Sequence, residues 1–250
     1  MYAAGLTDVG TTRSQNQDAI FVSNEKIGPF PNLFVVADGM GGHKAGDVAS
    51  CTAVDLFIGY VRDYPAAEFI KQENYLELLT TAATQAGERI YALSESDESM
   101  RGMGTTLTAC VIENKEAYIV HVGDSRAYAI WPLRIDQLTT DHTYVEQLLK
   151  AGKVSQEEAL AHPKRHVLTR VLGMPGDVEI DAFVSELADA SAVLLCSDGL
   201  SNMLDADTLI RIANGLGFVE NRVRYLVDEA NRRGGHDNIS VILIDIDKKR

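Results

Sequence analysis

The chain has 250 residues, of which 46% are apolar and 24% charged, and its 23 Lys and Arg against 36 Asp and Glu give a net charge of −13. These proportions are typical of a packed globular protein and exclude intrinsic disorder, while the acidity argues against a nucleic-acid binder. No apolar run approaches the ~20 residues that cross a bilayer, and residues 1–10 lack a signal-peptide pattern. We therefore expect a cytoplasmic protein without membrane association.

The three cysteines, Cys51, Cys110 and Cys196, are far apart in the sequence. An odd number without a C-x-x-C pair argues against a disulfide framework and against a thiolate zinc site. We expect all three to be buried free thiols.

The first half of the chain predicts strands at 19–22 and 33–37, followed by two helices. Apolar residues recur at helical spacing from Ala49 to Tyr60, and Pro65 ends this helix. The second helix is expected to begin at Asn74 as N-cap, with Glu77 three residues later. Strands rich in Thr, Val, Ile and Tyr follow at 105–112, 117–122 and 126–131.

Residues 143–172 form a polar insert between strands. A short helix there should end at Gly152, and a second is predicted by the capping box of Ser155 and Glu158. His162 and Pro163 end the second helix, so the insert has the pattern of a flap. Strands at 179–184 and 192–196, helices at 205–214 and 220–233, and a last strand at 239–245 complete the chain.

This order predicts an α+β fold, because many strands joined by short turns lie between two pairs of consecutive helices. A central antiparallel β-sandwich with a helix pair on each outer face, a four-layer αββα arrangement, would cover every apolar sheet surface. No repeat or low-complexity linker divides the chain. We therefore expect one domain over residues 1–250.

Four aspartates follow or precede buried strands next to a glycine or a tight turn: Asp38, Asp124, Asp198 and Asp237. Any one of them could simply cap a turn. Four in the same setting favour a shared cation site, since a carboxylate there is costly without a partner.

Oxygen ligands without His or Cys clusters favour Mg²⁺ or Mn²⁺. A pair of such ions suits phosphoryl chemistry. Arg13, beside Asn16 in the segment RSQNQD, is either a guanidinium that grips a phosphoryl group or a surface arginine in a weak ion pair.

Eight segments in order resemble the PPM (PP2C-type) metal-dependent protein serine/threonine phosphatases, in their compact bacterial form. They are RSQNQD (13–18), VVADGMGGHKAG (35–46), GMGTTL (102–107), VGDSRAY (122–128), LTTDHT (138–143), HPKRHVLTRVLG (162–173), LLCSDGLSNML (194–204) and GGHDNISVILI (234–244). The family fold is the helix-flanked sandwich expected above.

The resemblance implies a ligand set for two core ions, Mn²⁺ or Mg²⁺, and for a third, weaker ion. Asp38 would bridge the core ions, the Gly39 carbonyl would bind one, and Asp198 and Asp237 would bind the other. Asp124 matches the position that holds the third ion, and Asp18 would act through metal-bound water.

The resemblance also implies the residues around these ions. Arg13 would orient the phosphate, and His43 would either protonate the leaving group or support the site through hydrogen bonds. Asn238 would hold Asp237, and Asn16 is expected in the same supporting shell.

The implied reaction is hydrolysis of phosphoserine and phosphothreonine on proteins by in-line attack of a metal-bridging hydroxide. The expected partners are phosphorylated proteins, namely a bacterial Ser/Thr kinase and its substrates, and we expect a monomer. Two alternatives remain open: a phosphopeptide-binding module on the same fold, and a phosphatase for small metabolites.

Overall fold

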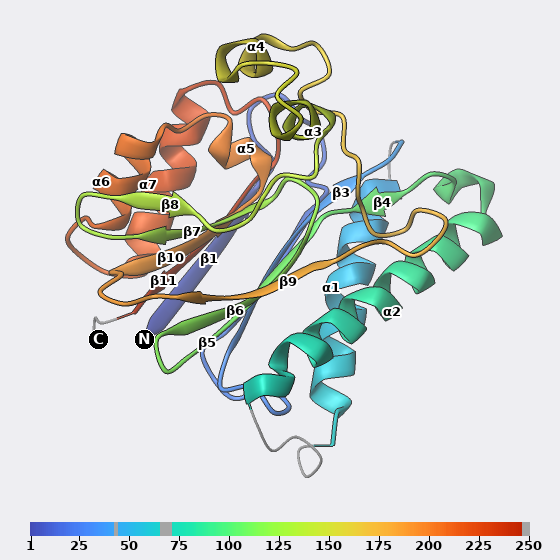
Figure 1. Ribbon diagram of the computed structural model, residues 1–250, viewed down its shortest axis with the longest axis horizontal. Helices are drawn as coiled ribbons and strands as arrows, with labels where there is room; N and C mark the ends of the chain where they lie inside the picture. The colour runs from blue at the N-terminus through green and yellow to red at the C-terminus, as the bar shows by residue number, and fades with distance from the viewer. Residues whose placement is uncertain (43–44, 66–71, 247–250) are drawn as a thin grey trace.

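A computed structural model describes residues 1–42, 45–65 and 72–246, and shows two antiparallel sheets stacked face to face (Figure 1). One sheet has the order β1-β11-β10-β7-β8, and the other β2-β3-β5-β6-β9, with β4 paired to β3. The strands are β1 (Tyr2–Asp8), β2 (Asp18–Ser23), β3 (Leu33–Met40), β4 (Gly104–Thr105), β5 (Leu107–Glu113), β6 (Glu116–Val122), β7 (Arg126–Ile130), β8 (Ile135–Gln137), β9 (Asp181–Glu186), β10 (Ala192–Cys196) and β11 (Ile239–Asp245).

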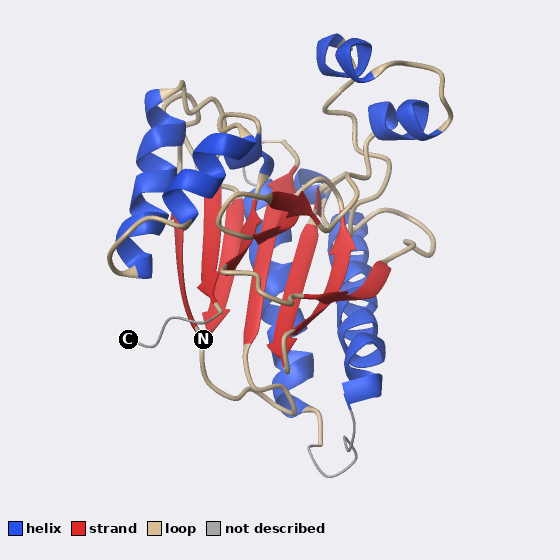
Figure 2. Ribbon diagram, turned by 60° about the vertical axis from the view of Figure 1, so that its left-hand side comes forward, coloured by secondary structure: helices blue, strands red, loops and turns tan. Residues whose placement is uncertain are grey.

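Helices cover the outer face of each sheet, as Figures 1 and 2 show. Helices α1 (Ala45–Asp63) and α2 (Tyr75–Ser96) cover the β3 sheet, while α5 (Asp198–Ser201), α6 (Ala206–Ala213) and α7 (Val219–Arg232) lie against the β11 sheet. Three apolar clusters fill the layers between them: one under α1 and α2, one under α6 and α7, and one between the sheets. The expected four-layer αββα fold is thus confirmed.

Side-chain alternation along β3 decides where its last carboxylate points. Leu33, Val35 and Ala37 pack toward the helices, whereas Phe34 and Val36 lie in the layer between the sheets. Asp38 continues the second series, so its carboxylate closes one end of the inter-sheet layer.

The flap insert contains α3 (Tyr144–Lys150) and α4 (Gln156–Ala161), which stand away from the sandwich in Figure 2. The capping box is present, because the Ser155 hydroxyl accepts from the Glu158 amide and the Glu158 carboxylate accepts from the Ser155 amide. The insert returns to the core through bridges of Thr143 with Leu168 and of Thr105 with Leu172.

Three expectations about local structure were wrong or incomplete. Asn74 ends a short 3-10 turn (Gln72–Asn74) in helical conformation, and its side chain makes no capping bond. Cys51 is exposed on α1, whereas Cys110 and Cys196 are buried. Strand β1 was not predicted, because its sequence YAAGLTD has a weak strand propensity.

Strand β1 forms because tertiary packing selects it. It pairs with β11 over its whole length, and a Cβ on Gly5 would lie only 2.8 Å from Cγ2 of Val22 on the facing sheet. The small residues that weaken the sequence pattern are therefore those that let the two sheets approach. Among the described residues, no helix combines the length and the apolar content needed to cross a bilayer.

Helix α7 is fastened to β11 by a buried ion pair between Arg222 and Asp245, which are 1% and 5% exposed. We expect Arg222→Met to lower the free energy of unfolding by about 3–5 kcal/mol, because Asp245 would remain buried without a counter-charge. The double variant Arg222→Met/Asp245→Leu should recover most of this loss. Denaturant titration measures both.

Arg232→Ala, at an exposed position of the same helix, is the matched control and should leave stability unchanged. Equal stability of Arg222→Met and wild type would contradict this account of the ion pair.

Candidate active site

A cleft of about 1110 Å³ opens at the end of the sandwich that Asp38 closes. Its walls come from segments far apart in the chain: the loop before β2, the end of β3, the β6–β7 turn, the flap with the segment after it, α5 and the residues before β11. The charged side chains that line it are Asp38, Asp124, Asp198 and Asp237, together with Arg13, Arg126, Arg165 and Arg170. The four aspartates singled out in the sequence are therefore brought together.

Asp18 and Asp38 face each other directly across the β2–β3 pair. Like charges in such a pair repel, and burial adds to the cost. Burial is the largest cause that raises the pKa of Asp18 to about 7, and Asp198 and Asp237 add to it. Burial and then the Asp18 charge raise the pKa of Asp38 well above its usual range.

Asp124 and Asp198 experience the same environment. Burial, followed by the charge of Asp198, raises the pKa of Asp124 to about 7. Burial, followed by the charge of Asp237, also raises the pKa of Asp198. Carboxylates whose negative charges repel one another in this way attract cations.

A chain of hydrogen-bonded hydroxyl groups holds the Asp18 carboxylate. The Ser197 hydroxyl donates to Asp18 Oδ2 at 2.8 Å and accepts from the Ser240 amide at 2.9 Å. Thr7 continues the chain to the Ser240 hydroxyl at 2.8 Å and accepts from Asn16 Nδ2 at 2.7 Å. The Asn16 side chain also accepts the Asp18 amide at 3.1 Å, so it orients Asp18 rather than entering the cleft.

The backbone of Asp38 is fixed by two threonines. Thr106 accepts the Asp38 amide through Oγ1 and donates its own amide to the Asp38 carbonyl, both at 2.9 Å, while the Thr105 hydroxyl donates to the same carbonyl at 2.9 Å. The next residue, Gly39, donates to the Gln17 carbonyl at 3.0 Å, and a Cβ there would lie 2.0 Å from the Gly46 carbonyl oxygen. Only glycine fits at this position.

Asp237 is held in place by Arg13 and by its own chain. Arg13 Nη2 donates to Asp237 Oδ2 at 2.7 Å, and the Asn238 amide donates to Asp237 Oδ1 at 2.9 Å. The Asn238 side chain turns the other way and binds the backbone of Val9, Gln15 and Gln17. Asn238 therefore fastens the segment after Arg13 to β11.

The donor set fits hard divalent cations. Among the described residues, no hydrogen-bond donor reaches the buried oxygens Asp18 Oδ1 and Asp198 Oδ1, and a buried carboxylate oxygen in that state needs a cation or a donor. The carboxylates line the cleft without closing on one point. In the described part of the chain, no three Asp, Glu, His or Cys side chains form a ready metal-binding group.

Comparisons with known proteins agree with this arrangement. The family model described as protein phosphatase 2C matches residues 11–230. The chain belongs to the protein phosphatase 2C (PPM) family.

Relatives match nearly end to end. The serine/threonine phosphatase stp of Listeria monocytogenes is 37% identical over 247 residues, covering 99% of this chain and 96% of the relative. Protein phosphatase PhpP of Streptococcus pneumoniae is 36% identical over 248 residues, covering 98% and 97%. The crystal structure of a serine/threonine phosphatase from Staphylococcus aureus superposes with a TM-score of 0.90 at 32% identity, covering 98% of this chain and 95% of that one.

Within this PPM-family cleft, the residues expected from the sequence fall into three groups. Asp38, Gly39, Asp124, Asp198, Asp237 and Arg13 line the cleft. Asn238 lines it as well, while Asp18 and Asn16 lie around it through the hydrogen bonds given above. His43 lies outside the described residues.

Sequence reasoning missed Thr106, Ser197 and Ser240, whose hydroxyl and amide groups hold Asp18 and Asp38. All three lie in motifs noted above, and Ser240 interrupts the apolar run of β11 at a buried position. A polar residue at an inward strand position was the available signal.

The carboxylates predict an unusual dependence of stability on pH in the metal-free protein. Because the pKa of Asp18 is about 7 when folded and 3.8 ordinarily, the folded state binds more protons between these values. The free energy of unfolding should therefore fall as pH rises from about 4 to 7, and Asp18→Asn should flatten this fall. Denaturant titrations across this pH range measure the difference.

Saturating Mn²⁺ should reverse the trend, since a cation binds the deprotonated carboxylates. Asp177→Asn, at an exposed position, is the control and should follow the wild-type curve. An Asp18→Asn curve parallel to wild type would show that Asp18 is not the responsible group.

Proposed function

We propose that this chain hydrolyses phosphoserine and phosphothreonine on proteins with the help of two divalent cations, Mn²⁺ or Mg²⁺. The observation that carries the proposal is the gathering of Asp38, Asp124, Asp198 and Asp237 around one cleft over the buried Asp18. Two carboxylate oxygens there have no hydrogen-bond partner in the described part of the chain. The names of the Listeria and Streptococcus relatives support the reaction class.

In this proposal Asp38, Asp198, Asp237 and the Gly39 carbonyl hold the two core ions, and Asp124 holds a third, weaker one. Asp18 contributes through water. When bound, such ions acidify water to near neutrality and offset the negative charge of a phosphoryl group. Water forms a bond to phosphorus as the bond from phosphorus to the Ser or Thr side-chain oxygen breaks on the opposite side, and that oxygen takes up a proton. Because water is the nucleophile, no covalent phosphoenzyme forms. In the described lining of the cleft there is no cysteine that could act as nucleophile.

Arg126, Arg165 and Arg170 also line the cleft, and we assign the binding of the substrate phosphate to Arg13. Its side chain is 52% exposed and rests on Asp237 through one nitrogen. A guanidinium has five N–H donors in a planar fork, so the remaining donors can bind two phosphoryl oxygens side by side. Arg13 therefore orients the phosphate for in-line attack. His43 remains the candidate for protonating the leaving oxygen or for supporting the site.

We further propose that residues 1–250 form one catalytic domain that acts as a monomer in the cytoplasm and reverses a bacterial Ser/Thr kinase. The cleft is built from residues of one chain, from the loop before β2 to the residues before β11, which supports a complete site in a single copy.

The ligand assignment predicts that Asp38→Asn and Asp198→Asn lose turnover by roughly a thousandfold or more, since cation stabilisation is worth several kcal/mol and each 1.4 kcal/mol is tenfold. The assay is Mn²⁺-dependent release of phosphate from p-nitrophenyl phosphate and from a phosphothreonine peptide. Thermal unfolding without metal should show both variants folded, because each change removes a repelling charge.

Near-normal turnover in either variant would contradict the assignment. A folded wild-type protein that is inert on both substrates, yet binds the phosphopeptide, would favour a binding module. Turnover of small phosphate esters with none on phosphoproteins would favour a metabolite phosphatase.

The assignment of Asp124 predicts a different phenotype. Asp124→Ala should lower turnover while the two tighter Mn²⁺ sites remain, because Asp124 lies on the β6–β7 turn beside the core ligands. Titration calorimetry with Mn²⁺ counts the sites and their affinities. Loss of all Mn²⁺ binding would instead place Asp124 among the core ligands.

A further inference from the structure

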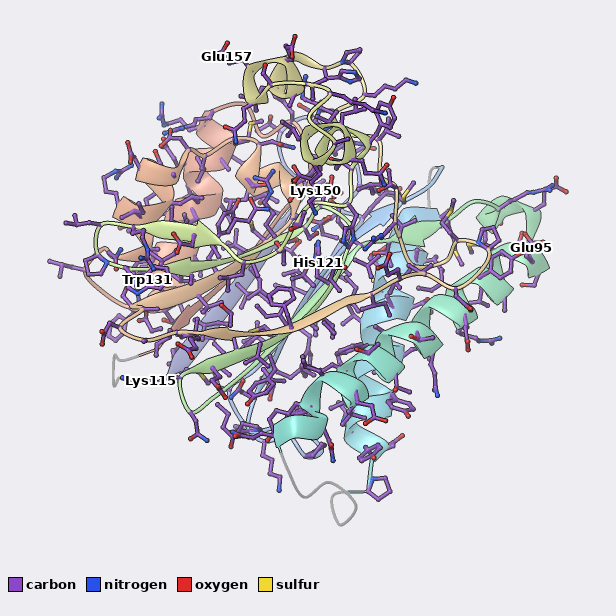
Figure 3. All side chains as sticks on the ribbon, viewed as in Figure 1. Glu95, Lys115, His121, Trp131, Lys150 and Glu157 are labelled. Carbon is purple, nitrogen blue, oxygen red and sulfur yellow. The ribbon has the colours of Figure 1, made fainter. Side chains whose placement is uncertain are left out.

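His142 lies at the point where the flap leaves the core, and it is 7% exposed. Its ring packs against that of His121, with ring centres 4.8 Å apart. His121 is fully buried, and Figure 3 shows it between the layers near the base of the flap. Neither imidazole has a part in the reaction proposed above.

The contacts of His142 fix the residue that precedes Asp124. Its Nδ1 accepts the Gly123 amide at 3.1 Å, and its own amide donates to the Gly123 carbonyl at 2.7 Å. Gly123 has a φ of +108°, and a Cβ there would lie 2.5 Å from Cγ2 of Thr106. The His142 side chain and the His142 amide thus hold both polar backbone groups of Gly123, at a turn that requires glycine.

The tautomer of His142 follows from these contacts. Because Nδ1 accepts from an amide, Nε2 carries the proton and donates to Asp181 Oδ2 at 3.1 Å. Arg170 donates to the other oxygen of that carboxylate at 2.9 Å. Burial also lowers the pKa of His142, so the neutral ring persists at neutral pH.

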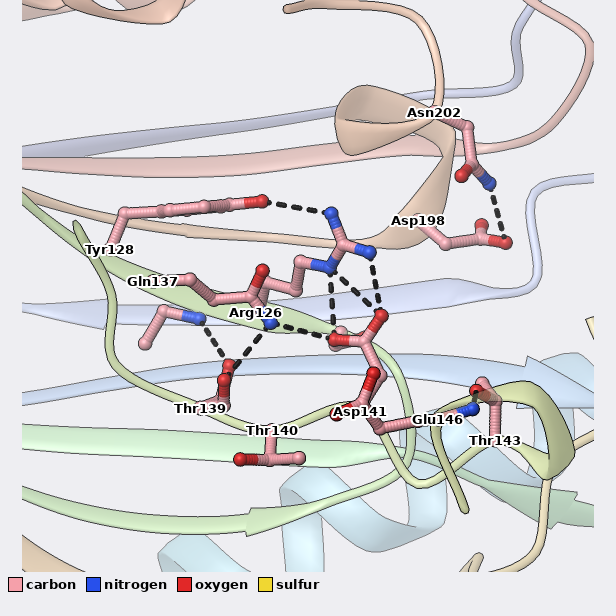
Figure 4. Close-up of polar contacts among 12 residues, drawn as sticks. Arg126, Tyr128, Gln137, Thr139, Thr140, Asp141, Thr143, Glu146, Asp198 and Asn202 are labelled. Atoms are coloured by element: carbon pink, nitrogen blue, oxygen red, sulfur yellow. Dashed lines mark hydrogen bonds and ion pairs between the residues drawn. The ribbon is translucent and has the colours of Figure 1, made fainter. Parts of the chain in front are cut away.

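Asp141 holds the other side of the same turn. As Figure 4 shows, Arg126 donates to Asp141 through Nε and Nη2, at 2.6 Å for the shortest contact, and reaches the Tyr128 hydroxyl at 3.1 Å. Gln137 also donates to Asp141 at 2.8 Å. Asp124 therefore lies between Gly123, which is hydrogen-bonded to His142, and Arg126, which is hydrogen-bonded to Asp141.

The same two residues begin the flap. The His142 carbonyl accepts the Thr169 amide at 2.8 Å, and the next residue, Thr143, caps α3 by accepting the Glu146 amide at 3.2 Å. The outgoing and returning ends of the flap thus meet at His142.

We propose that Asp141 and His142 are positioning residues that hold Asp124 in its binding orientation and couple it to the flap. The part that concerns a third ion rests on the function proposed above for Asp124. Partners in the shell around a metal ligand commonly change affinity by 10–100-fold when they are removed.

The test compares His142→Asn, His142→Gln and His142→Ala. Asn can present its oxygen at the position of Nδ1, whereas the Gln amide reaches the position of Nε2 instead. The first readout is hydrogen exchange of the Gly123 amide in metal-free protein. We expect exchange at least tenfold faster in the Ala and Gln variants and close to wild type in the Asn variant.

The second readout is Mn²⁺ titration calorimetry. The weakest Mn²⁺ site should lose affinity about tenfold or more in the Ala and Gln variants and recover in the Asn variant, while the two tighter sites are unchanged. Asp141→Asn, which keeps one acceptor for Arg126, should weaken only that same site.

Equal behaviour of the Asn and Gln variants, or an unchanged Gly123 amide in both Ala and Gln, would overturn the proposal. If Asp124→Ala leaves every Mn²⁺ affinity unchanged, the assigned role of Asp124 fails, and the coupling to a third ion fails with it. The exchange comparison still decides whether His142 holds the turn.

Discussion

The structure depends on one constraint. Two carboxylates face each other across a strand pair, at the end of the apolar layer between the sheets. Asp18 and Asp38 lie in adjacent strands, and the residues preceding Asp38 at every second position are packed between the sheets. Solvent screens their charges less effectively than it screens charges on the surface. The surroundings of the cleft are consequences of this placement.

Hydrogen-bond donors and one arginine offset part of this negative charge. Ser197 binds Asp18 from below, Thr106 fixes the backbone of Asp38, and Arg13 neutralises Asp237 at the rim. Asp18 Oδ1 and Asp198 Oδ1 remain without a hydrogen-bond partner among the described residues. Under the proposed metal-dependent function, a cleft arranged in this way lowers the stability of the empty protein in exchange for affinity toward divalent cations, as binding sites commonly do.

Much of the fold could be predicted from the sequence, because the apolar runs of β3, β10 and β11 and the capping box of Ser155 are local signals. What could not be predicted depends on partners distant in sequence. Strand β1 is selected by β11 and by the close approach of Gly5 to Val22 on the facing sheet. Likewise, the aspartates of the site could be found beside their strands, but the hydroxyls of Ser197 and Ser240 gain meaning only when their strands pair.

The attachment of the flap has an evolutionary consequence. Its outgoing and returning ends lie side by side at Thr143 and Leu168, so the stretch between them forms a closed excursion from the sandwich. Insertions, deletions or wholesale replacement of that stretch leave the strand register intact, since a longer loop costs little extra closure entropy. Selection can therefore diversify what docks above the cleft while the chemistry beneath it stays constant.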